Sequence, residues 1–149
     1  LREIFSGRID NWKSLGGAEA PIEVASHASG SGTYDVWMEV VMNDSIVTQK
    51  ARILGSRPLQ KYIAEHPNAL GYNAVAYTDA TVKILTVDGV PGNKETIRDG
   101  TYPLKRELTL YGRKDMSETA RRFIRYFLDP GKGQKIVRKL GNIPVHNDH

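Results

Sequence analysis

The residues that could do chemistry are concentrated in one short stretch, Gly30-Ser31-Gly32-Thr33. A β-branched run at residues 22–25 comes before it and apolar residues at helical spacing follow it, so the stretch joins a strand to the start of a helix. The first amides of a helix have no partner within the helix, and the helix dipole adds partial positive charge there. Glycines let a ligand approach the backbone closely, and the two hydroxyls add hydrogen-bond donors. The stretch therefore predicts a site for a compact oxyanion. A helix N-cap formed by Ser31 or Thr33 is the purely structural alternative.

Other known loop motifs do not fit these residues. A Walker A loop requires a following Gly-Lys-Ser/Thr, the dinucleotide fingerprint requires a third glycine, and a serine-hydrolase elbow requires glycine where Ser29 stands. His27 precedes Ser31 by four positions on an extended segment, and no third group is evident to orient it, so a catalytic dyad is not expected. We expect a binding protein and not an enzyme. The loop residues expected to bind the anion are Gly30, Ser31, Gly32 and Thr33.

The elements that must position this site can be traced along the chain. Helical spacing predicts short helices at residues 1–5, from about Thr33, and at residues 56–66, where Pro67 ends the last one. Strands are expected at residues 22–25, 69–77, 82–87 and 104–111. The clearest helix has apolar residues from Ala120 to Leu128, with a possible capping box of Asp115 and Glu118, and a last helix ends before Gly141.

Strands that alternate with helices indicate an α/β fold with a mostly parallel or mixed sheet. The aromatic residues Trp12, Trp37 and Phe123 lie on apolar patterns, so we expect them in the core, and the same default applies to Tyr72 and Tyr77.

Composition narrows the range of functions. The chain has 149 residues and no cysteine, which excludes a disulfide scaffold and a thiol nucleophile. Its four histidines (His27, His66, His146 and His149) do not pair with carboxylates at metal-ligand spacing, so neither a metal site nor a cofactor is expected. No run approaches the ~18 apolar residues that a membrane-spanning helix needs.

The net charge of +4 is unevenly distributed along the chain. Residues 1–100 carry 10 basic and 12 acidic side chains, whereas residues 101–149 carry 11 basic and 5 acidic ones. The basic residues of the last third alternate with apolar residues at helical spacing, which is typical of a solvated helix face. Nucleic acid is therefore not an expected partner.

Several further motifs, in a fixed order, extend the pattern over nearly the whole chain. They are residues 1–12 (LREIFSGRIDNW), 30–33 (GSGT), 71–77 (GYNAVAY), 87–90 (VDGV), 96–97 (TI), 100–104 (GTYPL), 110–111 (LY), 133–137 (GQKIV) and 141–144 (GNIP). In this order the sequence closely resembles the extracytoplasmic phosphate-binding proteins of ABC importers (PstS-like). The resemblance implies a type II periplasmic-binding-protein fold, in which two α/β lobes clamp phosphate between them.

Matched to that family, the chain corresponds to its second half. Residues 1–100 would form most of the second lobe, which carries the anion loop, and residues 101–149 would supply the returning strand and terminal helices of the first lobe. The fold expected for this chain is thus a lobe with a central mixed sheet flanked by helices, together with an incomplete second lobe. The segment that completes the first lobe would be a partner, as would phosphate or a related oxyanion and the membrane permease of an ABC importer. The location implied is periplasmic or extracellular, and attachment to the membrane through a segment outside this sequence is the alternative.

The resemblance also implies two ligand-binding residues beside the anion, His27 and Ser29, and both depart from the family pattern. His27 stands where these proteins commonly have an arginine that grips phosphate, and Ser29 stands where they commonly have an aspartate that accepts the proton of hydrogen phosphate. Histidine does not replace the fixed charge and planar donor fork of arginine. Serine, unlike a carboxylate, does not repel a fully deprotonated anion such as sulfate. The alternatives are therefore a receptor for another oxyanion, or a sensory or protein-interaction module with altered or lost anion specificity.

Overall fold

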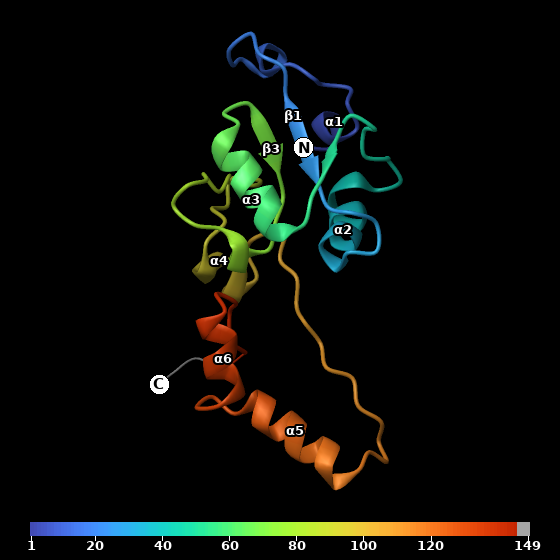
Figure 1. The fold of residues 1–149 in the computed structure, drawn as a ribbon, viewed down its shortest axis with the longest axis vertical. Coiled ribbons are helices and arrows are strands. Elements are labelled where there is room, and N and C mark those ends of the chain that lie inside the picture. The colour runs from blue at the N-terminus through green and yellow to red at the C-terminus, as the bar shows by residue number, and fades with distance from the viewer. Residues whose placement is uncertain (146–149) are drawn as a thin grey trace. The chain divides into compact units, whose positions relative to one another are not determined.

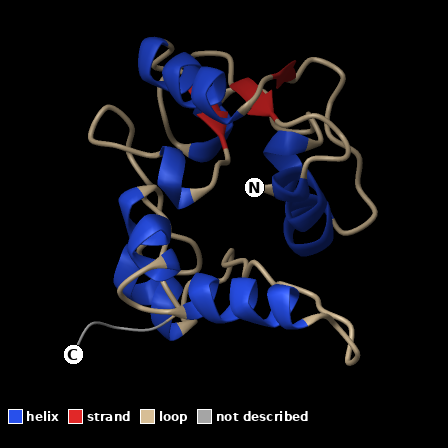
Figure 2. Ribbon diagram, turned by 60° about the horizontal axis from the view of Figure 1, so that its bottom comes forward, coloured by secondary structure: helices blue, strands red, loops and turns tan. Residues whose placement is uncertain are grey.

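The structure is a computed structural model that describes residues 1–145, so His146 and His149 lie outside the described residues. The chain divides into two compact units, Leu1–Leu85 (unit 1) and Thr86–His149 (unit 2). Figures 1 and 2 show the elements of both units.

A three-stranded sheet forms the centre of unit 1. Strand β1 (Glu23–Ser26) lies between β2 (Arg52–Ile53) and β3 (Ala69–Gly71), and both neighbours run parallel to it (Figure 1). The α/β class is confirmed, but within the described residues the sheet is parallel and not mixed. The sequence did not indicate β2, because two exposed residues are too few to show an alternating pattern.

Helices flank this sheet as the apolar spacing predicted. They are α1 (Arg2–Phe5), α2 (Gly32–Trp37) with a π-helical continuation at Met38–Met42, and α3 (Ser56–Glu65). Two short 3-10 helices, Trp12–Leu15 and Val75–Tyr77, complete unit 1.

The core of unit 1 is aromatic and aliphatic. Phe5, Met42 and Leu59 are almost fully buried, and the Phe5 and Trp37 ring centroids are 4.6 Å apart. Trp37 is in the core as expected, whereas Trp12 is only partly buried and donates its Nε1 hydrogen to the Asn68 carbonyl at 3.1 Å. This core holds β1 and α2, the two elements that the Gly-Ser stretch connects.

Three helices are found in the described part of unit 2: α4 (Lys94–Asp99), α5 (Glu118–Leu128) and α6 (Gly133–Lys139). The expected helices at α5 and α6 are confirmed, and Gly141 follows α6 with a φ of +84°. The proposed capping box of Asp115 and Glu118 is wrong. Ser117 caps α5 instead, because its hydroxyl accepts a hydrogen bond from the Ala120 amide at 3.3 Å.

Phe123 on α5 is not a core residue, because 60% of its surface is exposed. The apolar spacing of α5 identified a helix face correctly. Within the described residues of unit 2, however, only Gly133 and Gln134 are buried, so the structure contains no covered core on that face.

Two expected strands are absent from the described residues. Residues 82–87 form no strand beyond a single bridge between Val87 and Val90. Residues 104–111 are loop, which Figure 1 shows as the orange segment before α5. An isolated strand leaves its backbone groups without ladder partners, and no backbone hydrogen bond reaches residues 106–111. The returning strand expected there is therefore not formed in this chain.

The strand expected at residues 69–77 is shorter than predicted and ends at Gly71. Beyond it the side chain of Asn73 accepts a hydrogen bond from the Ala74 amide at 3.0 Å and donates to the Ser56 carbonyl at 2.8 Å. Such side-chain bonds compete with a sheet ladder, so the chain turns into the 3-10 helix that begins at Val75.

Gln134 joins separate parts of unit 2. Its Nε2 donates to the Phe127 carbonyl at 2.9 Å, and its Oε1 accepts from the Val145 amide at 2.8 Å. The side chain is 1% exposed, so both bonds are protected from water. Through them the end of α5, the start of α6 and the segment after α6 are held together.

Candidate functional site

The Gly-Ser loop (residues 27–33) begins where β1 ends and finishes in the first turn of α2. β1 is buried along Val24–Ser26 and pairs with a strand on each side, so its end is firmly placed. Gly30 has a φ of +84°, a backbone conformation that residues with a Cβ rarely adopt, and it lets the chain turn from the strand into the helix.

The helix start forms the N-cap that the sequence offered as its structural interpretation. Ser31 is the N-cap, and its hydroxyl accepts from the Thr33 amide at 3.3 Å. The Asp35 amide donates to the Ser31 carbonyl at 3.0 Å, which closes the first turn. The amides of Gly32 and Tyr34 have no acceptor among the described residues. A cap is therefore present, and two backbone donors beside it remain available.

The outer part of the loop is accessible. Ser29 and Gly30 are exposed, Ser31, Gly32 and Thr33 are partly exposed, and nothing lies within 4 Å of the position that a Cβ on Gly30 would take. The outer loop is therefore open to solvent around Ser29 and Gly30.

His27 is the exception, because it is only 3% exposed. Its Nε2 is buried and has no hydrogen-bond partner in the described chain. Burial lowers the pKa of His27 below its ordinary value, an effect that contacts with Tyr72 and Asn73 partly oppose. A solvated histidine has a pKa of ~6.5. The structure favours the neutral imidazole at neutral pH.

Two residues near the loop were missed as functional candidates. The hydroxyl of Tyr72 is 2.8 Å from Ser26 Oγ, and the Tyr72 ring stacks on Trp37 of α2. Asn73 lies beside His27 and is bonded to the start of α3. Their sequence pattern indicates only a buried segment, so no signal in the sequence distinguishes them from ordinary core residues.

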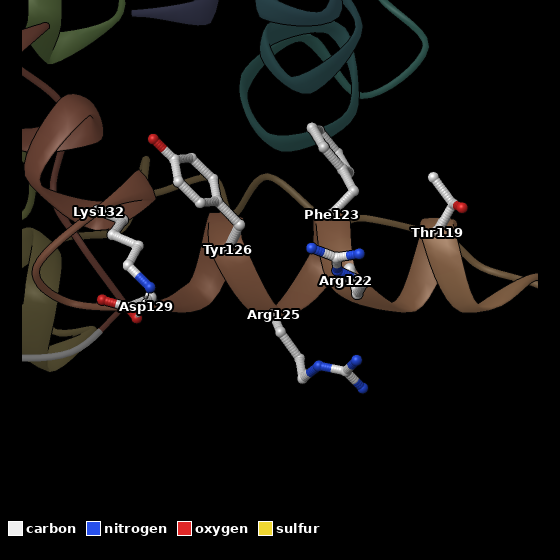
Figure 3. Close-up of a pocket in the computed structure, with 7 residues that line it drawn as sticks. All are labelled: Thr119, Arg122, Phe123, Arg125, Tyr126, Asp129 and Lys132. Atoms are coloured by element: carbon white, nitrogen blue, oxygen red, sulfur yellow. Dashed lines mark ion pairs between the residues drawn. The ribbon is translucent and has the colours of Figure 1, made fainter.

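Two hollows lie away from the Gly-Ser loop. The larger one, about 640 Å³, runs along α5 and the turn after it, and Phe123 and Tyr126 point to one side of the helix while Arg125 points to the other (Figure 3). The smaller one, about 230 Å³, lies in unit 1 between α1, β1 and β2. Neither includes a residue of the loop. Among residues 1–145 no group of three histidine, aspartate or glutamate side chains could hold a metal ion.

Comparison with known proteins identifies the family to which this chain belongs. The PBP superfamily domain matches residues 1–130, which is most of the chain. The chain belongs to this family. The phosphate-binding protein PstS of Bacillus subtilis (strain 168) is 31% identical over 146 residues, which are 97% of this chain and 49% of the relative. The chain therefore spans about half the length of that relative.

Solved structures agree with the family assignment. A phosphate ABC transporter substrate-binding protein from Clostridium perfringens, solved with bound phosphate, is 34% identical with a TM-score of 0.82, over 97% of this chain and 60% of that one. PstS from Borrelia burgdorferi is 25% identical with a TM-score of 0.73, over 98% of this chain and 62% of that one. An ABC-type phosphate transport receptor from Vibrio cholerae, at 23% identity and a TM-score of 0.80, shares the fold.

These findings confirm the resemblance and the fold class expected from the sequence. The relatives of this PBP-family chain are binding proteins of transport systems and not enzymes, in agreement with the motif analysis. Among residues 1–145 no helix combines the length and the apolar character needed to cross a bilayer.

Proposed function

We propose that this PBP-family chain is the loop-bearing part of an extracytoplasmic binding protein that delivers phosphate, or a similar small oxyanion, to the permease of an ABC importer. The anion is held by Ser31, Gly32 and Thr33, with Gly30, Ser29 and His27 beside it. The observation that carries this proposal is the start of α2, where the Gly32 and Tyr34 amides have no acceptor in the described chain and lie next to a partly exposed Thr33 hydroxyl. The phosphate bound in the Clostridium perfringens relative supports the choice of ligand.

The chain supplies one side of the anion site. We assign residues 1–100 to the second lobe and residues 101–149 to the returning segment and terminal helices of the first lobe. The remaining part of the first lobe would contribute the other donors. The coverage of only 49% of the Bacillus subtilis relative supports the idea that this chain corresponds to part of the two-lobed protein.

The expected affinity can be estimated from the hydrogen bonds that this one side of the anion site supplies. Hydrogen bonds to a charged group contribute ~1.5–3 kcal/mol each, so three or four would give roughly 5–10 kcal/mol. Association removes at least ~4 kcal/mol through lost translational and rotational freedom. The remainder corresponds to a dissociation constant of roughly millimolar for this chain alone. Tighter capture needs the donors of the other lobe.

The test is titration of the chain with inorganic phosphate, followed by phosphorus NMR or calorimetry. Thr33→Val removes the hydroxyl and keeps the shape, and it should weaken binding about tenfold, since one bond to a charged group is lost. Thr78→Val is the matched control, because its hydroxyl donates only to the Val75 carbonyl at 2.8 Å. Equal phosphate affinity in wild type and Thr33→Val would refute the assigned site.

Ser29 provides a test of anion selectivity. A carboxylate at position 29 would accept the proton of hydrogen phosphate and repel sulfate, which has none to give. Ser29→Asp should therefore lower sulfate affinity relative to phosphate, measured by competition between the two anions. A sulfate-to-phosphate ratio that does not change would show that position 29 does not face the ligand.

The second candidate is a sensory or protein-interaction module of the same fold, and the state of His27 favours it. A buried neutral imidazole lacks the fixed positive charge that an arginine would bring to the anion. Replacing Gly32 with valine should abolish any anion site but leave the rest of unit 1 folded. Binding of the permease that survives this change would support the module, and its loss would support the anion receptor.

A further inference from the structure

Tyr72 contacts the structure on both sides of the Gly-Ser loop. Its hydroxyl is 2.8 Å from Ser26 Oγ, at the end of β1 where the loop begins. Its ring lies parallel to that of Trp37, in the helix where the loop ends, with centroids 4.1 Å apart and planes 1° apart. One side chain therefore connects the strand that enters the loop with the helix that leaves it.

The hydroxyl contacts are concentrated at the His27 end of the loop. Ser26 is fully buried and also donates to the His27 carbonyl at 3.2 Å, while the His27 amide donates to Tyr72 Oη at 3.4 Å. Burial raises the pKa of Tyr72, so the hydroxyl keeps its proton at neutral pH. The Ser26 side chain and the His27 amide are thus both bonded to Tyr72, the residue that directly follows β3.

The backbone around Tyr72 is itself tightly placed. Gly71 pairs with Ala25, and a Cβ at Gly71 would lie 3.0 Å from a Leu59 methyl and 3.3 Å from the Ala25 carbonyl oxygen. On the other side, Asn73 donates to the Ser56 carbonyl at the start of α3. The backbone on both sides of Tyr72 is therefore held in place, so the Tyr72 side chain can fix the position of the loop.

We propose that Tyr72 is the positioning residue of the Gly-Ser loop: its hydroxyl fixes the His27 end and its ring fixes the helix end, so that the amides of residues 32–34 are held at one spacing. Donors fixed before the ligand arrives bind it more tightly, because less ordering is needed on association. The consequence for the ligand rests on the function proposed above, whereas the effect on the loop does not.

The experiment compares Tyr72→Phe with Tyr62→Phe in this chain. Both changes remove one tyrosine hydroxyl from unit 1 and keep the ring. Tyr62 lies on α3, and its hydroxyl donates to Glu23 Oε2 at 2.5 Å, away from the loop. Two properties are measured: affinity for inorganic phosphate, and amide hydrogen exchange at Ser31 and Asp35, which donate to the Ala28 and Ser31 carbonyls.

We expect Tyr72→Phe to speed exchange at Ser31 and Asp35 about three- to tenfold and to weaken phosphate binding by a similar factor, as the loss of one hydrogen bond implies. The Leu59 amide in α3, which donates to the Gly55 carbonyl at 2.8 Å, should keep its wild-type rate. Tyr62→Phe should leave Ser31 and Asp35 unchanged.

The outcomes separate this inference from the proposed function. Unchanged exchange at Ser31 and Asp35 in Tyr72→Phe overturns the inference, whether or not phosphate binds. Wild-type phosphate affinity in Tyr72→Phe also overturns it, if Thr33→Val weakens binding in the same series. Faster loop exchange in a chain whose wild type binds no phosphate supports the role of Tyr72 in the loop and refutes the proposed ligand.

Discussion

The two units use similar apolar residues in different ways. In unit 1, Phe5 and Trp37 are buried against each other and against Tyr72, whereas in unit 2 Phe123 is 60% exposed and Leu140 is 65% exposed. Unit 1 has a sheet on which helices can bury their apolar faces, and the described part of unit 2 has none. A helix with an apolar face gains most of its stability from the surface that covers that face. The comparison indicates that unit 1 contains its own core, whereas the apolar helix face in the described part of unit 2 is uncovered.

The largest expected difference in stability comes from replacing one phenylalanine in each unit with alanine. Phe5→Ala should lower the free energy of unfolding by about 3–5 kcal/mol, because it leaves a cavity in a packed core. Phe123→Ala should change it by less than about 0.5 kcal/mol, as at other exposed sites. Urea titration followed by far-UV circular dichroism, which reports helices of both units, measures both effects. Equal losses in the two variants would break the comparison.

Amide hydrogen exchange should show the same difference in stability between the two units without any substitution. Amides in β1 and α3 should exchange on the order of 100-fold more slowly than those in α5, since local opening of a poorly buried helix needs less free energy than opening of the sheet. Mass spectrometry of peptides from each element measures this ratio. Similar protection in α5 and β1 would mean that unit 2 has a core of its own.

His27 gives unit 1 a pH dependence, and no histidine lies in the described part of unit 2, residues 86–145. Burial lowers its pKa in the folded state, so the unfolded chain binds a proton first as the pH falls below about 6.5. Unit 1 should therefore lose stability in this range by at most about 1.4 kcal/mol per pH unit, and should regain it as the pH rises. Unfolding of wild type and His27→Gln at pH 7.5 and pH 5.5 measures the effect. The substitution should remove the part of the slope that His27 contributes.

The smallest effect is expected from a matched pair of helix caps. Ser31 and Ser117 each accept an amide hydrogen bond at 3.3 Å at the start of a helix. Ser31→Ala should reduce the stability of unit 1 by about 1 kcal/mol, because α2 is part of its cooperative core. Ser117→Ala should lower the helicity seen by circular dichroism and leave the urea midpoint of unit 1 unchanged. A shift of that midpoint by Ser117→Ala would show that the units unfold together.

The sequence predicted the local part of the site well. The position of the loop between a strand and a helix follows from composition and spacing, and Ser31 caps α2 where the small residues indicated a helix start. The burial of His27 could not be predicted, because it depends on Tyr72, which is 45 residues further along the chain. Contacts between distant segments leave no trace in local periodicity.

The same limit explains the errors in the sheet. Residues 104–111 alternate as a strand does, yet alternation describes a segment suited to pairing and not the presence of a partner. Strand β2 shows the converse: two residues with no pattern pair with β1 because the chain between α2 and α3 brings them there. Helices α3 and α5 were predicted more accurately, since their hydrogen bonds lie within the segment.

Gln134 has a consequence for how the end of the chain would assemble. One primary amide bridges two backbone groups, so α5, α6 and the following segment form a preassembled piece that is joined by polar bonds rather than by apolar contact. Such a piece can keep its internal geometry in water while its apolar face is uncovered. A complementary lobe would then receive one ready-made part in a single docking step, and would not have to order two separate helices.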